Sequence, residues 1–196
     1  MTTPLKHTKL FGGAITADIP SNFADVSNIR QVPNNQEVYL DINGFTSLTF
    51  DITERVSHVS TNKDALEYHF ADIVAEEDTQ NIWSVVENVE LPNFPRTTPI
   101  LALTAITKPP ASTVPANSLT PTHTNVQFTL IRLVEQCTDI AITLNTPHFA
   151  GEADGQIANG REARTRPWET EQELGNMYHQ IVTSFAIKDW GLFNGE

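Results

Sequence analysis

The chain has 196 residues, enough to bury the core of one compact domain, and its 39% of hydrophobic residues argue against wholesale disorder. Its 24 acidic residues outnumber 12 basic ones and give a formal net charge of −12. The negative electrostatic field of this charge repels phosphate backbones and anionic membranes and attracts basic partners. We therefore expect neither nucleic acid nor a membrane surface as partner.

The first residues lack the apolar stretch of a secretory signal, and no run of about 18 apolar residues occurs anywhere. This predicts a chain that is neither secreted nor membrane-spanning. The single cysteine, Cys137, has no disulfide partner, which fits a reducing compartment. Because it follows a long apolar run, we expect it to be a small core residue and not a reactive thiol.

The first strand is expected over residues 13–20, and Asp25 then fits the cap of a short helical turn. Residues 36–41 and 47–55 are expected to form two strands, and in the second Leu48, Phe50 and Ile52 alternate with polar residues, as in a half-buried strand. Asn43-Gly44 lies between them and tolerates the positive φ of a hairpin turn. The pattern predicts a hairpin.

Helical spacing begins at Asn62 and continues to Val74. The predicted helix carries one buried stripe, made of Leu66, His69, Phe70, Ile73 and Val74. Its other surfaces are acidic, which indicates that they face solvent.

The second half contains further apolar runs and one more helix. Apolar runs follow at residues 83–91, 100–107, 124–134 and 138–145. The run at 124–134 is apolar on both faces, which is typical of an interior strand, and residues 135–137 suit a hairpin to the next strand. Helical spacing returns over residues 167–183, where Pro167 fits the first turn.

Two segments, residues 108–123 and 147–166, fit no regular element and are predicted to be mobile loops. The remaining pattern predicts an α+β fold, a mainly antiparallel six- or seven-stranded sheet with helices packed on both faces. We expect one domain over residues 1–196.

A search for catalytic motifs finds no nucleophile elbow, P-loop, dinucleotide fingerprint or zinc helix. Gly12-Gly13 lacks the Lys-Ser or Lys-Thr of a phosphate loop and is better explained as a tight turn. The six histidines are scattered, and only His69 has a carboxylate, Asp72, at helical spacing. We therefore expect no metal, no cofactor and no enzymatic nucleophile.

The stretch from Asp25 to Tyr39 combines a helix cap, a proline turn, side-chain amides and a carboxylate that leads into a strand. A purely structural explanation has Asp25 as the cap, Asn34-Asn35 as a turn and Glu37 in solvent. The functional explanation makes the same stretch a contact surface for another protein. The residue pattern alone leaves both open.

Several stretches resemble one known family, the Ran guanine nucleotide release factors, or Mog family of nuclear-import proteins. The stretches are Leu10 to Ile15, Asp25-Val26-Ser27 with Arg30, Val32-Pro33, Gln36 to Tyr39, Tyr68 to Asp72, Leu130 to Leu133 with Thr138-Asp139, and Asp189 with Phe193. The resemblance spans essentially the whole chain and is most specific in the first forty residues.

The resemblance implies a single Mog-like Ran-binding domain that binds the GTPase Ran and promotes release of its nucleotide, in the nucleus and cytoplasm and as a monomer. The partner-binding residues it implies are Asp25, Arg30, Pro33, Asn34, Asn35, Gln36 and Glu37. The family commonly has Asp at the position of Asn34, so contact or release is expected to weaken if that carboxylate is needed.

Two other functions remain open at this point. The first is a passive adaptor or chaperone that binds Ran or another trafficking protein without changing its affinity for nucleotide. The second is a small-ligand or hydrolytic enzyme with a site under the 108–123 segment, for which a pocket lined by His123, His148 and carboxylates would be the sign.

Overall fold

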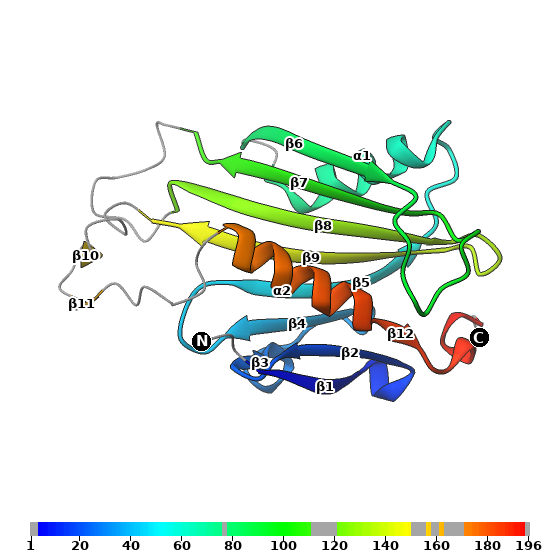
Figure 1. Ribbon diagram of the computed structural model, residues 1–196, viewed down its shortest axis with the longest axis horizontal. Helices are drawn as coiled ribbons and strands as arrows, with labels where there is room; N and C mark the ends of the chain where they lie inside the picture. The colour runs from blue at the N-terminus through cyan, green and yellow to red at the C-terminus, as the bar shows by residue number, and fades with distance from the viewer. Residues whose placement is uncertain are drawn as a thin grey trace.

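The computed structural model describes residues 4–75, 78–110, 121–149, 156–157, 161–162 and 171–194 (Figure 1). The expected loop positions 111–120, most of 150–166 and the first turn of the expected second helix lie outside these residues. Within the described part, no helix combines the length and apolar character needed to cross a membrane.

The main element is a seven-stranded sheet in which every neighbouring pair is antiparallel. Its order is β3 (Phe23–Asp25), β4 (Gln36–Asp41), β5 (Ser47–Glu54), β9 (Thr138–His148), β8 (His123–Leu133), β7 (Ile100–Lys108) and β6 (Thr79–Glu87). The strand at 124–134 is interior, as predicted, and the predicted hairpin joins it to β9. The large antiparallel sheet with two helices is confirmed.

A second, three-stranded sheet was not predicted. It consists of β1 (Leu5–Leu10), β2 (Ile15–Pro20) and β12 (Ala186–Ile187), with β2 in the middle. β1 gives little hydrophobic signal because most of its side chains are polar or exposed, and β12 is too short for a periodicity. The last strand of the described residues therefore pairs with the first predicted strand.

Helix α1 (Asn62–Ile73) begins at a capping box, in which Thr61 accepts from the Asp64 N–H and the Asp64 carboxylate accepts from the Thr61 N–H. Helix α2 (Glu171–Ser184) crosses in front of the large sheet in Figure 1. α1 ends one residue before the predicted boundary, and Ile73 at the end of the expected stripe is 41% exposed.

Two hydrophobic cores use alternate residues of the same strands. Ile131 and Leu133 of β8 pack in a core with α2 and the small sheet, while Phe128 and Leu130 pack in another with α1. Because successive side chains of a strand point to opposite faces, the two cores lie on opposite faces of the large sheet. The small sheet and α2 thus cover the same face.

Three details differ from the prediction. Cys137 is exposed, not buried, because it occupies the turn between β8 and β9 with a positive φ of 50°. Lys108 and His123 belong to β7 and β8, and residues 147–148 belong to β9, so the expected loops are shorter. Within the second expected loop, β10 (Gln156–Ile157) pairs with β11 (Arg161–Glu162).

Candidate functional site

The stretch singled out in the sequence begins with a capped turn. Asp25 ends β3, and its Oδ1 accepts a hydrogen bond from the Ser27 N–H at 2.8 Å. This cap starts the 3₁₀ turn η2 (Val26–Asn28), as predicted. Pro33 follows after the turn has ended, and its carbonyl accepts from the Gln36 N–H at the start of β4.

A groove of about 400 Å³ lies beside this stretch. Its lining includes Asp25, Pro33, Asn34, Gln36 and Glu37, together with Phe11 and Gly12 near the N-terminus and Leu192 near the C-terminus. The predicted contact residues Arg30 and Asn35 do not line it, and the Arg30 side chain is exposed. Most of the candidate residues therefore share one concave surface.

Glu37 is half-buried and each of its carboxylate oxygens accepts a hydrogen bond inside the protein, so the purely structural explanation that places Glu37 in solvent does not hold. Its Oε1 accepts from the Phe11 N–H at 2.5 Å, and its Oε2 accepts from the Tyr39 hydroxyl at 3.0 Å. Burial raises the pKa of Tyr39 well above its usual range, and the negative charges of Glu37 and Asp25 raise it further. Two acidic side chains, Asp25 and Glu37, line the groove.

The amides of Asn35 and Gln36 also act inside the protein. Asn35 Nδ2 donates to Asp51 Oδ1 at 2.9 Å, and Gln36 Nε2 donates to Asp51 Oδ2 at 3.0 Å. Burial raises the pKa of Asp51 above its ordinary value, although these two hydrogen bonds and the charge of His69 oppose the shift. Both amides thus tie the start of β4 to β5.

A turn with three successive positive φ angles approaches Glu37 from the N-terminal side. This 3₁₀ turn, η1 (Phe11–Gly13), has φ of 49° at Phe11, 66° at Gly12 and 99° at Gly13. Glycine adopts such angles without a steric penalty, whereas an aromatic residue does so rarely. The tight turn expected at Gly12-Gly13 is confirmed.

The C-terminal segment meets the same turn. The carbonyl of Ala14 accepts hydrogen bonds from the N–H groups of Lys188, at 2.8 Å, and Asp189, at 3.0 Å. Asp189 then caps the 3₁₀ turn η5 (Trp190–Phe193) by accepting from the Gly191 N–H at 2.8 Å. Three stretches that the resemblance marked separately are therefore neighbours, and this convergence was not visible in the sequence.

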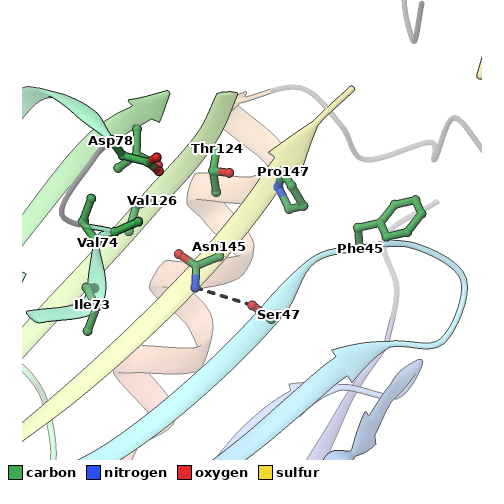
Figure 2. A pocket seen from close by; sticks show the side chains of 11 residues that line it. Phe45, Ser47, Ile73, Val74, Asp78, Thr124, Val126, Asn145 and Pro147 are labelled. Carbon is green, nitrogen blue, oxygen red and sulfur yellow. Dashed lines mark hydrogen bonds between the residues drawn. The ribbon is translucent and has the colours of Figure 1, made fainter. Parts of the chain in front are cut away.

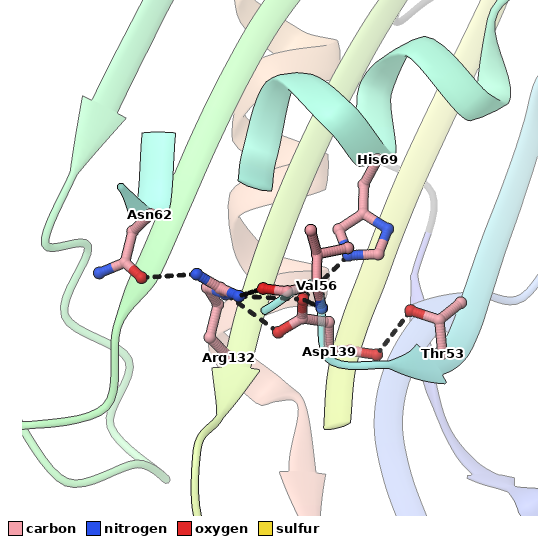
Figure 3. Close-up of polar contacts among 6 residues, drawn as sticks. All are labelled: Thr53, Val56, Asn62, His69, Arg132 and Asp139. Atoms are coloured by element: carbon pink, nitrogen blue, oxygen red, sulfur yellow. Dashed lines mark hydrogen bonds and ion pairs between the residues drawn. The ribbon is translucent and has the colours of Figure 1, made fainter. Parts of the chain in front are cut away.

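A buried polar cluster lies on the α1 face of the sheet (Figure 3). His69 Nε2 lies 2.9 Å from Asp139 Oδ2, so the partner of His69 is Asp139 and not Asp72. Arg132 Nε donates to Asp139 Oδ1 at 3.1 Å and Val56 N–H donates to Oδ2 at 3.0 Å, while Arg132 Nη2 also donates to the Val56 carbonyl. The cluster joins α1, β8, β9 and the segment after β5.

Burial alone would raise the pKa of Asp139, which is fully buried. The hydrogen bonds from His69, Arg132 and the Val56 N–H, and the positive charge of Arg132, outweigh burial and hold that pKa below its ordinary value. The cluster is thus an internal ion pair, and its residues do not line the groove.

A smaller cavity of about 240 Å³ opens where α1 ends. In Figure 2, Ile73 and Val74 lie on one side of it and Phe45 and Pro147 on the other. Asn145 Nδ2 lies 3.5 Å from Ser47 Oγ between them. Its lining mixes apolar and polar side chains and includes one carboxylate, Asp78.

The hydrolytic alternative requires His123 and His148 to converge with carboxylates. The two imidazoles are cross-strand partners whose rings stack at a centroid distance of 4.5 Å. Across the described ranges, no group of three or more His, Cys, Asp and Glu side chains is placed to hold a metal ion.

Comparison with known proteins gives a consistent result over the whole chain. A family model described as Ran-interacting Mog1 protein matches residues 8–147. The probable ran guanine nucleotide release factor of Dictyostelium discoideum is 28% identical over 98% of both chains. The Ran guanine nucleotide release factor of Homo sapiens is 29% identical over 97% of both.

Solved structures show the same fold. The crystal structure of the Saccharomyces cerevisiae Ran-binding protein Mog1p superposes with a TM-score of 0.69 and 24% identity, covering 98% of this chain and all of that one. The cyanobacterial PsbP of Synechocystis reaches a TM-score of 0.53 at 11% identity over 95% of this chain and 94% of its own. The fold is thus shared beyond the family, whereas the sequence match is specific: this chain belongs to the family of Ran-interacting Mog1 proteins.

Proposed function

We propose that this protein binds the small GTPase Ran and promotes release of its guanine nucleotide, in support of nuclear protein import. The observation that carries the proposal is the groove, which gathers Asp25, Asn34 and Glu37 on one concave surface. The family match supports the choice of Ran as partner. A monomer that works in nucleus and cytoplasm fits this role.

The proposed mechanism is non-covalent. A GTPase holds its nucleotide with a P-loop lysine, backbone amides and magnesium, so negative charge brought close to them weakens that hold. The carboxylate of Asp25, which lines the groove, supplies such charge. By thermodynamic linkage, bound nucleotide must in return lower the affinity of Ran for this protein.

The test is to load Ran with a fluorescent nucleotide and measure its release with the wild-type protein and with Glu37→Lys. We expect the wild type to accelerate release and the variant to lose most of that effect. Glu87→Lys is the matched control, because Glu87 is exposed on β6 at the opposite edge of the sheet. Release that stays at the spontaneous rate with the wild type would overturn the proposal.

A passive adaptor is the second candidate, and one observation favours it. The Glu37 carboxylate and the Asn35 and Gln36 amide nitrogens already have partners inside the protein, so fewer polar groups can act on the nucleotide site. An adaptor would bind Ran with the same affinity whether or not nucleotide is present. Binding measured against both forms of Ran separates the two functions.

A further inference from the structure

We propose that Glu37 is a positioning residue that serves Ran binding through the shape of the groove and not through its charge. This inference rests on the proposed function. The Glu37 carboxylate holds η1, and through η1 the C-terminal turn η5, in the arrangement that forms one wall of the groove.

A hydrogen bond connects β4 to η1. Glu37 and Phe11 are 26 residues apart, and the 2.5 Å hydrogen bond from the Phe11 N–H joins them. Phe11 adopts a φ of 49°, which an aromatic residue tolerates only when its surroundings impose it. The Glu37 carboxylate supplies a charged acceptor at that residue, so it stabilises the turn where the backbone is least favourable.

Two further hydrogen bonds connect the end of η1 to the C-terminal segment. The carbonyl of Ala14, one residue after η1, accepts from both Lys188 and Asp189. Those two hydrogen bonds set where η5 begins, and the Asp189 cap shapes it. A displacement of η1 therefore also displaces η5.

The wall of the groove combines residues of both turns. Phe11 of η1 and Leu192 of η5 both line the groove. Leu192 is 38% exposed and the neighbouring Trp190 is 43% exposed. Large apolar side chains at the rim of a groove that also carries carboxylates are suited to desolvated contact with a partner. The wall is continuous with the Asp25 to Glu37 edge.

The hydrogen bonding of Glu37 explains why its charge is not the contact. Each of its two oxygens already accepts one hydrogen bond, from Phe11 and from Tyr39. The side chain is half-buried under η1, whereas Asn34 beside it is exposed. Ran therefore contacts the surface that Glu37 holds in place, and not Glu37 itself.

The test compares Glu37→Gln with Glu37→Ala. Glutamine removes the charge but keeps an oxygen that can accept from the Phe11 N–H, whereas alanine removes both. We expect the affinity for nucleotide-free Ran to stay within about threefold in Glu37→Gln and to fall about tenfold or more in Glu37→Ala. Equal losses in the two variants would overturn the proposal, because a direct charge contact predicts that result.

A second measurement uses the free protein and does not depend on Ran. Amide hydrogen exchange at Phe11, Lys188 and Asp189 reports the hydrogen bonds of the two turns. We expect exchange there to accelerate in Glu37→Ala and to change little in Glu37→Gln. Unchanged exchange in Glu37→Ala would refute the positioning role, whereas a wild type that fails to bind Ran would refute the proposed function.

A double-mutant cycle separates positioning from general stability. Leu192→Ala alone should weaken Ran binding although both carboxylates remain. In the Glu37→Ala background, Leu192→Ala should add little, because the wall is already displaced. Additive losses would contradict the proposed link between Glu37 and Leu192.

Discussion

Asp139 is the residue on which the most buried polar contacts depend. It is fully buried and accepts from Arg132 and Val56, with His69 at 2.9 Å. Replacing Asp139 by Asn leaves the Arg132 charge buried without its counter-ion. We expect Asp139→Asn to lower the free energy of unfolding by about 3–5 kcal/mol in urea titrations. The control Asp72→Asn, on the exposed side of α1, should change it by less than about 0.5 kcal/mol.

The same carboxylate predicts a pH dependence. Because the folded state holds the pKa of Asp139 below its ordinary value, its contribution to stability is complete above the unfolded pKa of about 3.9. It is lost as the pH falls through the lower, folded pKa. Thermal unfolding in acid should therefore show a steep loss of stability below about pH 4 that is shallower in Asp139→Asn. Parallel curves for the two proteins would contradict this.

Asn34 is the residue at which the chain departs from the family pattern. It is exposed and lines the groove, so a carboxylate there would add charge without burial. We expect Asn34→Asp to accelerate nucleotide release from Ran by up to about fivefold, since roughly 1 kcal/mol is the upper range for one exposed charge pair. Asn34→Ser serves as the uncharged control. An unchanged rate in Asn34→Asp would mean that Asn34 acts only as a turn residue.

At the scale of elements, α1 depends on its N-terminal cap. The Thr61 hydroxyl accepts from the Asp64 N–H at 3.0 Å, and the Asp64 carboxylate accepts from the Thr61 N–H at 3.0 Å. We expect Thr61→Ala to cost about 1 kcal/mol of unfolding free energy, measured in denaturant. Thr61→Ser keeps the hydroxyl and should cost little. A loss of the same size in both variants would point to the Thr61 methyl group instead of the cap.

Elements with a strong local pattern could be predicted from the sequence, and those defined by distant partners could not. The strand at 36–41 and the helix start at Asn62 match the structure because a hairpin turn beside a strand and helical spacing are local signals. β1 and β12 were missed because pairing with β2 defines them, not their own hydrophobicity.

The site shows the same division. Asp25 could be recognised as a cap from its neighbours in sequence, and it is one. Glu37 could be recognised as a candidate, but the sequence left open whether it lies in solvent or in a contact surface, because its partner Phe11 comes from another element. For His69 the sequence showed only Asp72 at helical spacing, because such spacing cannot reveal a partner such as Asp139 on a strand of the sheet.

At the scale of the whole molecule, the net charge of −12 governs association. A field of this size accelerates encounter with a basic surface, and salt screens it over about 10 Å at 0.1 M and about 3 Å at 1 M. We expect the association rate constant with Ran to fall about tenfold or more between low and high salt, with a nearly constant dissociation rate, in stopped-flow experiments. A salt-independent association rate would show that the charge does not steer this partner.

The pairing of β12 with β2 also has a consequence for synthesis. η1 and β4 leave the ribosome early, whereas Lys188, Asp189 and η5 are made only after both helices and the seven strands of the large sheet. A nascent chain can thus form its large sheet while the wall of its groove is still missing. Because Leu192 lines the groove, a chain that has been made and folded only as far as β9 has no complete groove to offer.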